Sequence, residues 1–509
     1  MSVLCITLLL ISLDNTVLNV ALPSIANRLD ASASELQWMV DAYAVVFAGL
    51  LLSLGALGDR AGRKWVFMGG LVVFGAGSML AAWSASPLAL TVSRAIMGVG
   101  AAALMPCTLS ILTNVFTSER DRVRAIGIWS GTMGIGVALG PILGGVLLAH
   151  FWWGSVFLIN VPIAAAGLIA SIWLVPNSRN PSSSRPDAIG SFVSMLGLGL
   201  FLWGVIEAPS RGWTSPLIAG SLVAGAVLLT AFVFWERAID HPMLPLRFFT
   251  NRRYSVAIGA LALVLFSLIG MFFLMTQYLQ FDLGYSPLAA GIRVIPVATS
   301  LLVVAPFSVL VARLLGTKYV VGTGLLLIAV AFGLLSRTTV AGDYRDCFIP
   351  FLLVGVGVAL ALAPCTESVM GSLPKRHAGV GSATNDAAMQ VGGALGVGVL
   401  GTVLNLRYQH VMTSAIAHVN VPAFVQRLID SSLGAALAVS RRAPKSQGEE
   451  LASLARRAFV SGMDEALVIA TFVICAAGLV VLMLLPNRGR DEQEAMDANE
   501  DRPRSLTRP

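Results

Sequence analysis

Charge is the property that this sequence has least of. Only 12% of its 509 residues are charged, 56% are hydrophobic, and the mean hydropathy is +0.80. A soluble domain usually carries about 25% charged residues, so the composition excludes a soluble globular protein and predicts a polytopic membrane protein. The net charge of +7 does not indicate nucleic-acid binding, because the basic residues cluster in short loops between apolar runs, as the positive-inside rule describes.

Patterns that bind metals or nucleotides are also missing. The five cysteines lie singly in apolar stretches, without a C-x-x-C pair, and the five histidines have no metal-ligand spacing. No G-x-x-x-x-G-K-[ST] motif occurs, which excludes a Walker-type ATP site. Residues 396–401 read G-V-G-V-L-G, but they lie inside an apolar helix and not after a strand, so we interpret them as helix packing. We expect no metal, no cofactor and, without a nucleophile–base set, no enzyme.

Long apolar runs make up most of the chain. A run of about 20 residues matches roughly 30 Å of bilayer hydrocarbon, and the predicted spans cover residues 2–23, 36–57, 65–85, 88–116, 125–149, 156–176, 188–208, 216–235, 254–279, 288–314, 319–335, 348–373, 380–404 and 466–486. The sequence therefore predicts an all-α fold with about fourteen transmembrane helices. No basic leader precedes the first run, so we expect the sequence to begin a few residues late.

The polar segments divide these spans into groups. The predicted parts are an N-terminal six-helix bundle (1–176), a cytoplasmic linker (177–187), an inserted helix pair with its loop (188–253), a C-terminal six-helix bundle (254–486) with a long extracytoplasmic loop (405–465), and a cytoplasmic tail (487–509). A weak internal repeat supports two halves: residues 60–66 resemble 313–320, and 98–106 resemble 355–364.

Loop charges predict the orientation. Short loops rich in Lys and Arg follow the even-numbered spans, so they share one side with both termini, which the positive-inside rule makes cytoplasmic. Segment 405–465 is basic yet lies on the other side, as long loops translocate largely regardless of charge. Its periodic Phe424, Leu428 and Leu433 predict one or two surface helices.

The most charged short loop joins the second and third spans. Residues 55–64 read G-A-L-G-D-R-A-G-R-K and resemble the loop signature of the major facilitator superfamily. The resemblance implies a conformational gating role for Gly55, Asp59, Arg60, Gly62, Arg63 and Lys64. An acid in this loop can pair with the start of a neighbouring helix or with an Arg of the other half. Such a pair forms in one conformation and breaks in the other. The alternative is a charge cluster that only sets topology.

Three further segments resemble, in order, the first-helix signature of the fourteen-helix drug:proton antiporter branch of that superfamily (EmrB/QacA type), the fourth-helix motif of the whole superfamily, and the fifth-helix antiporter motif. They are residues 13–23 (L-D-N-T-V-L-N-V-A-L-P), 90–102 (L-T-V-S-R-A-I-M-G-V-G-A-A) and 136–145 (G-V-A-L-G-P-I-L-G-G). In the last segment, the antiporter motif comprises Gly136, Gly140, Pro141, Gly144 and Gly145. Glycines spaced by four form a smooth helix face that a second helix can approach closely, and Pro141 removes a backbone hydrogen bond. A plain packing face is the alternative reading.

A few charged residues fall within or beside the spans. The candidates for proton coupling or substrate binding are Asp14, Asp41, Arg94, Glu367 and Asp386. An ionised group at mid-membrane is costly, so these side chains should face a cavity or a partner. Arg94 stays charged and needs an acid or a carbonyl. Asp41, near Trp38 and Tyr43, is placed to attract a lipophilic cation. For each acid, a structural hydrogen bond or helix cap remains the alternative.

The resemblance implies a major facilitator fold of two six-helix bundles plus an inserted pair, with a cavity at their interface. It also implies proton-coupled export of lipophilic, often cationic drugs or antibiotics across the inner membrane of a bacterium. Expected partners are a small-molecule substrate, protons and membrane lipids, with the protein working as a monomer and no sign of an adaptor. Alternatives are export of one endogenous metabolite or antibiotic and, less favoured by residues 136–145, proton-coupled import.

Overall fold

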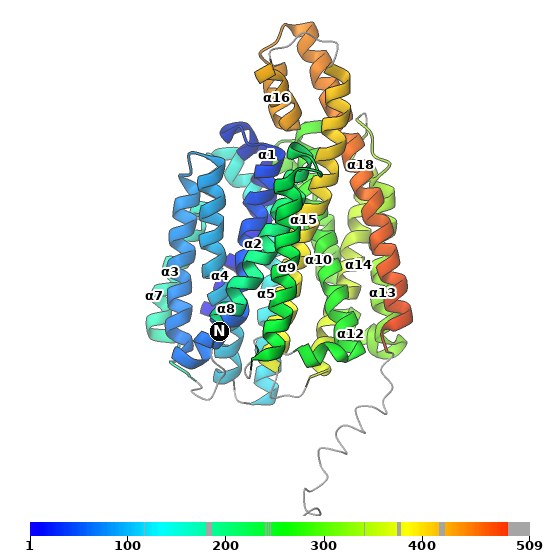
Figure 1. The fold of residues 1–509 in the computed structure, drawn as a ribbon. Coiled ribbons are helices and arrows are strands. Elements are labelled where there is room, and N and C mark those ends of the chain that lie inside the picture. The colour runs from blue at the N-terminus through cyan, green and yellow to red at the C-terminus, as the bar shows by residue number, and fades with distance from the viewer. Residues whose placement is uncertain are drawn as a thin grey trace, which may run out of the picture.

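The computed structural model describes residues 1–116, 118–179, 186–239, 242, 244, 246–340, 342–373, 378–416 and 423–486. Within these residues the chain is helical and contains no strand, which confirms the predicted all-α fold (Figure 1). The helices are α1 (Ser2–Leu29), α2 (Ala33–Ala61), α3 (Arg63–Ala82), α4 (Pro87–Val115), α5 (Glu119–His150), α6 (Ser155–Leu158), α7 (Asn160–Leu174), α8 (Ala188–Arg211), α9 (Pro216–Ala238), η1 (Leu246–Thr250), α10 (Arg252–Gln277), η2 (Tyr278–Asp282), α11 (Pro287–Arg293), α12 (Ile295–Leu315), α13 (Thr317–Leu335), α14 (Tyr344–Gly371), α15 (Ala378–Ile416), α16 (Ala423–Ser431), α17 (Leu433–Ser440) and α18 (Lys445–Leu484).

Thirteen helical stretches in the described ranges are long and apolar enough to cross a membrane. The remaining predicted span corresponds to α5, a 32-residue helix whose described apolar part is Leu139–His150. Two predicted spans are interrupted. The sixth is divided into α6 and α7 at Ile159, and the tenth is divided into α11 and α12 at Val294.

Local sequence signals place several helix starts. Ser32 caps α2 in a reciprocal capping box with Glu35, and Ser86 caps α4 with Pro87 in the first turn. The side chains of Asp187 and Asn251 cap α8 and α10 by accepting hydrogen bonds from backbone N–H groups in the first turn of each helix. Such side chains accept hydrogen bonds from the N–H groups that a helix start leaves unpaired, so each span begins at a polar residue beside an apolar run.

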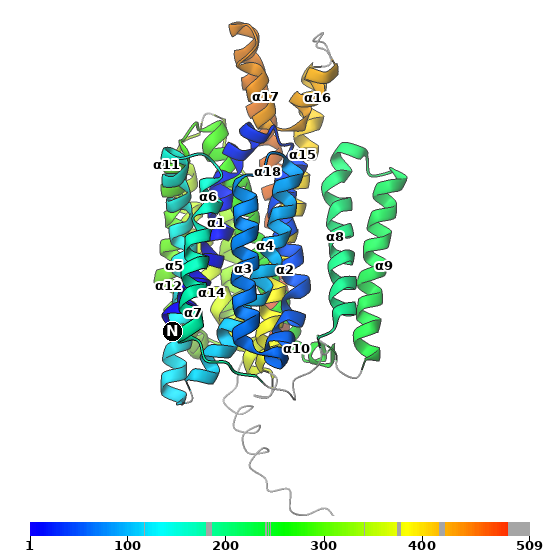
Figure 2. The same ribbon diagram turned by 90° about the vertical axis from the view of Figure 1, so that its left-hand side faces the viewer.

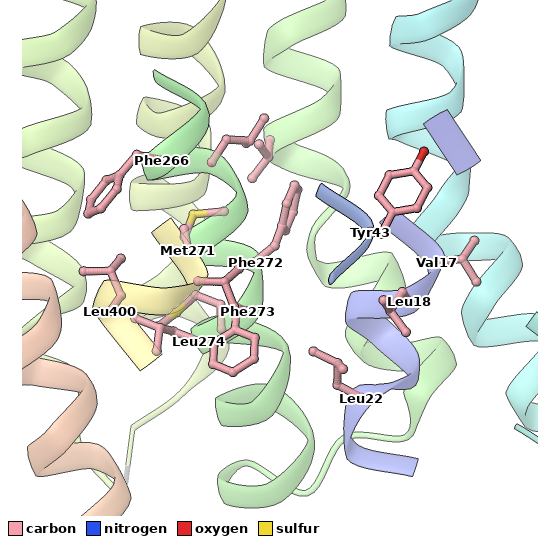
Figure 3. Close-up of a cluster of buried hydrophobic side chains, with 14 of the residues drawn as sticks. Val17, Leu18, Leu22, Tyr43, Phe266, Met271, Phe272, Phe273, Leu274 and Leu400 are labelled. Atoms are coloured by element: carbon pink, nitrogen blue, oxygen red, sulfur yellow. The ribbon is translucent and has the colours of Figure 1, made fainter. Parts of the chain in front are cut away.

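The spans form two bundles with a helix pair at one side (Figures 1 and 2). In the first bundle, α1 packs on α5, and α2 and α3 pack on α4. In the second, α10 packs on α15, and α12 and α13 pack on α14. Figure 3 shows apolar side chains where the bundles meet, with Leu18 and Tyr43 from the first and Phe272, Phe273 and Leu400 from the second.

The predicted internal repeat has a structural counterpart. Gly62, between α2 and α3, and Gly316, between α12 and α13, have φ values of 121° and 102°, a region that favours glycine. Gly98 of α4 lies against the backbone of α2, and Gly355 of α14 lies against the backbone of α12 in the same way. Both halves therefore use the same turn and the same close helix contact.

The last two long helices extend past the predicted membrane boundaries. α15 continues to Ile416 and α18 begins at Lys445, so most of segment 405–465, predicted as a loop, is helical. Residues 405–416 contain neither Gly nor Pro, and nothing ends the helix there. Together with α16 and α17, which lie where the sequence predicts one or two surface helices, these extensions project from one end of the molecule (Figure 1). We call this the hairpin end, and the opposite end, with the Gly62 turn, the loop end.

The inserted pair α8–α9 contacts both bundles through α8. On α2, Ser53 Oγ lies 2.6 Å from Ser191 Oγ, and a Cβ added to Gly49 would lie 2.7 Å from Met195 Cβ. On α15, Thr402 Oγ1 donates to the Val205 carbonyl at 3.1 Å. α8 thus covers the seam where α2 of the first bundle meets α15 of the second.

Candidate functional site

A cavity of about 110 Å³ lies between the two bundles. Its wall is largely apolar and aromatic, with Tyr43, Phe47 and Phe272 among the largest side chains. The polar groups that line it are Ser12, Asn15, Thr16, Tyr43, Arg94, Asp386 and Gln390. Ligand pockets typically measure about 300–1,000 Å³, so a drug-sized molecule would require this cavity to widen.

Sequence reasoning missed several of these lining residues. Ser12, Asn15 and Thr16 on α1 share one helix face, which points away from Asp14, whereas Met389 and Gln390 on α15 share a face with the predicted acid Asp386. Polar residues at three- and four-residue intervals within an apolar span were the available signal, since such residues rarely face lipid.

Arg94 and Asp14 form a buried ion pair beside the cavity. Arg94 Nη1 lies 2.5 Å from Asp14 Oδ2, and each side chain is 1% exposed. The same guanidinium donates from Nε to the Met39 carbonyl at 3.1 Å and lies over the Tyr43 ring, 4.3 Å from its centroid. Asn160 donates to Asp14 Oδ1 at 2.9 Å. Arg94 therefore has both the acid and the carbonyl partner that the sequence left open.

Asp386 is a cavity-lining acid on the second bundle. Asn385 Nδ2 donates to Asp386 Oδ1 at 3.3 Å, and Thr366 Oγ1 donates to Asn385 Oδ1 at 3.2 Å. This carboxyl group lines the same cavity as the aromatic side chains of Tyr43, Phe47 and Phe272. Cations are attracted both to carboxylates and to aromatic faces.

Asp41 does not line this cavity. Its side chain is fully buried behind the wall residues Val40 and Ala44, where α2, α8 and α15 meet. A Cβ added to Gly398 of α15 would lie 3.4 Å from Asp41 Oδ2. The sequence placed Asp41 beside a cavity-bound cation, whereas in this structure a helix of the inserted pair covers it.

Glu367 lies away from the cavity, toward the loop end of α14. Glu367 Oε1 lies 3.2 Å from Arg313 Nη2 of α12, with the side chains 27% and 65% exposed. An exposed ion pair of this kind contributes little to the free energy of unfolding. The structure therefore places Glu367 and Asp386 in different surroundings, although the sequence put both in one group.

The charged loop at Gly62 is held within the first bundle. Asp59 Oδ1 accepts hydrogen bonds from Arg63 Nε at 2.7 Å and Ser110 Oγ at 3.1 Å. Lys64 Nζ donates to the Ile172 carbonyl at 2.7 Å, while Arg60 is exposed. These contacts join the turn to α4 and α7, so the acid pairs with neighbouring helices of its own bundle in this conformation.

The glycine motif of α5 faces two different helices. Gly136, Gly140 and Gly144 lie against Ser12, Thr16 and Val17 of α1, with no room for a side chain at the first two positions. Gly145 faces the second bundle, where an added Cβ would lie 2.5 Å from Leu288 Cα of α11. Gly291 of α11 approaches the Pro141 carbonyl equally closely. The motif therefore packs one bundle internally and also closes it against the other.

The bundles are joined on the hairpin side of the cavity. Gln280 Nε2 donates to the Val20 carbonyl at 2.9 Å, and Gln37 Nε2 donates to the carbonyls of Val397 and Gly398, each at 3.1 Å. Together with the α5–α11 contact, these bonds close the hairpin end. In transporters built from two bundles, rocking of one against the other opens such an end while closing the opposite one.

Known proteins are similar to this chain in sequence and in fold. The sequence matches the Major Facilitator Superfamily over residues 4–397. It is 35% identical to the multidrug efflux pump LfrA of Mycolicibacterium smegmatis, over 94% of this chain and 95% of that protein. It is 32% identical to the methyl viologen resistance protein SmvA of Salmonella typhimurium, over 93% and 94%. It is 31% identical to the tetracenomycin C resistance and export protein of Streptomyces glaucescens, over 93% and 89%.

Among solved structures, a bacterial homologue of the human lysosomal transporter Spinster, in an inward-facing and unoccupied conformation, superposes with a TM-score of 0.67. Its sequence identity is 17%, and the match covers 95% of this chain and 96% of that one. At this identity the likeness concerns the fold, which agrees with the two bundles described above. The chain therefore belongs to the major facilitator superfamily, whose matched members here are membrane transporters and not enzymes.

Proposed function

We propose that this protein exports lipophilic, cationic drugs or antibiotics across the bacterial cytoplasmic membrane in exchange for protons. The observation that carries the proposal is the charge of the central cavity. Arg94 is neutralised by Asp14, which leaves Asp386 as the acid on a mostly apolar and aromatic wall. Such a wall favours binding of a lipophilic molecule with one positive charge.

The names of the relatives support export of drugs or antibiotics. LfrA is named a multidrug efflux pump, SmvA a methyl viologen resistance protein, and the Streptomyces glaucescens relative a resistance and export protein. By the positive-inside rule, the loop end, with Arg60, Arg63 and Lys64, faces the cytoplasm. The cavity would then take substrate from the cytoplasm when the hairpin end is closed.

Protonation of Asp386 would couple the two fluxes. When the hairpin end opens, a proton from the outside neutralises the carboxylate, and the cavity loses the charge that held the cation. The cation leaves, and the proton is carried inward when the bundles return.

The direct test is ethidium transport into inverted membrane vesicles with an imposed pH gradient, acid inside. The protein is expected to drive ethidium uptake, and Asp386→Asn is expected to lower the initial rate about tenfold or more, the effect of about 1.4 kcal/mol of lost cation binding. Ethidium fluorescence in the vesicles measures the rate.

Glu207→Gln is the matched control. This acid lies on α8 and pairs with Arg211 at 3.0 Å, apart from the cavity, so the variant is expected to transport ethidium like the unmodified protein. If Asp386→Asn transports as fast as Glu207→Gln, then Asp386 does not carry the coupling. If the folded, unmodified protein moves no ethidium, the substrate is not a lipophilic cation of this kind.

A further inference from the structure

The seam between α2 and α15 contains an acid with no partner. Asp41 has 0% exposure, and neither of its carboxyl oxygens has a hydrogen-bond partner in the described part of the chain. Its surroundings are apolar, because Ala44, Val45, Leu202, Ile206 and Ala394 form one cluster there. An ionised carboxylate in such a place is very costly, and a buried group of this kind becomes neutral instead.

The charged groups on the helices around Asp41 are all engaged or distant. On α4, Arg94 is paired with Asp14 of α1. On α8, Glu207 is paired with Arg211. On α15, Asp386 lies twelve residues before Gly398, which is roughly 18 Å along a helix. On α2 and α3, Glu35 caps its own helix and Arg63 binds Asp59 at the loop end. On α15, Arg407 is paired with Glu465. Thus no cation among the residues that the structure describes balances an ionised Asp41 while the seam is closed.

The seam is also a contact between the two bundles. One turn before Asp41, the fully buried Gln37 donates to the carbonyls of Val397 and Gly398. α8 covers the seam from its outer side and contacts both helices, through Ser34 Oγ to the Ile206 carbonyl at 3.5 Å and Thr402 Oγ1 to the Val205 carbonyl at 3.1 Å. Closing the hairpin end therefore encloses Asp41 between α2, α8 and α15.

We infer that Asp41 is a proton-dependent latch of this seam, separate from the substrate cavity. When α2 and α15 part at the hairpin end, water reaches the carboxyl group and it loses its proton to that side. The seam closes again only after a proton from the same side returns to Asp41, since the closed seam accepts only the neutral form. The inserted pair completes the latch by excluding lipid and water from it.

The inference rests on the proposed function only in that the seam opens during transport, so its test uses conformation without substrate. Spin labels on Arg28→Cys and His410→Cys, both exposed sites toward the hairpin end of different bundles, report the opening of that end. The half-buried Cys5 and Cys475 are replaced by serine. Double electron–electron resonance then gives the distance distribution at mildly acidic and mildly alkaline pH.

For the protein with native Asp41, the long-distance population is expected to grow as pH rises. Asp41→Asn, which imitates the neutral carboxyl group, is expected to lose this pH dependence and keep the short distance at both pH values. Asp41→Glu restores a titratable group and is expected to restore a pH dependence. The neutral variant should fold at least as well, because it replaces no paired charge.

Either of two results would overturn the latch: distances that do not change with pH in the presence of native Asp41, or an unchanged pH dependence in Asp41→Asn. Neither result depends on ethidium transport. A protein that fails to export ethidium can still show the Asp41-dependent distance change, and a protein that exports it can lack that change, so the two proposals fail separately.

Discussion

Asp14→Leu is expected to abolish export and to lower the free energy of unfolding by about 3–5 kcal/mol, the cost of leaving one member of a buried ion pair without its partner. Arg94 would keep the Met39 carbonyl, the Met97 sulfur and the Tyr43 ring, none of which is charged. Asn160, which now donates to Asp14, would lose an acceptor as well. The apparent melting temperature of the purified protein in detergent and the rate of ethidium transport measure the two effects.

A double variant separates the charge from the packing. Asp14→Leu combined with Arg94→Met removes both charges and keeps similar volumes, so it is expected to recover most of the lost stability, as replaced buried ion pairs do. Export should stay absent, because the cavity has lost a polar wall group. A double variant no more stable than the single one, or a single variant as stable as the unmodified protein, would contradict the ion-pair account.

Gly140→Ala is expected to have the second largest effect. The added methyl group would overlap Thr16 Oγ1 and lie 2.8 Å from Thr16 Cβ, and Thr16 is itself held by a hydrogen bond to the Ser12 carbonyl at 3.0 Å. α1 and α5 would have to separate, at a cost of about 1–3 kcal/mol for an overpacked contact. Because α1 also supplies one wall of the cavity, we expect slower export together with a lower melting temperature.

Gly259→Ala is the matched control, since an added Cβ at this helical position meets nothing within 4 Å. Alanine favours a helix over glycine by about 1 kcal/mol, so this variant should be as stable as the unmodified protein or slightly more so. Equal melting temperatures for Gly140→Ala and Gly259→Ala would show that the α1–α5 contact tolerates a side chain, contrary to the close approach described here.

The spans and their order followed from hydrophobicity alone, because twenty apolar residues in a row have few stable alternatives to crossing a bilayer. The charged loop at residues 55–64 and the smooth face of Gly136 and Gly140 were also predicted, since each depends on short-range sequence or on the helix period. The helical extension over residues 405–416 was not predicted. A helix that packs on few neighbours lacks a clear apolar stripe, so its polar sequence cannot be told from that of a loop.

The structure separates acidic residues that the sequence analysis had placed in one group of candidate site residues. Asp14, Asp41, Glu367 and Asp386 were one set of acids near the membrane interior. The structure pairs Asp14 with Arg94, places Glu367 beside Arg313 at the surface, brings Asp386 to the cavity and covers Asp41 with α8. Which partner faces an acid depends on which helix lies opposite, and residues 80 or 360 positions apart carry no local sign of that contact.

The sequence by itself therefore determined the membrane class, the positions of the apolar spans, the repeat and the family resemblance, all of which rest on composition, period and short motifs. Only the tertiary structure decided which charges cancel, which acid remains for a substrate and which one is enclosed at a seam. The physical reason is that the protonation and binding properties of a carboxyl group depend on the solvent, charges and hydrogen-bond donors within a few ångströms, and helices distant in the sequence supply those surroundings.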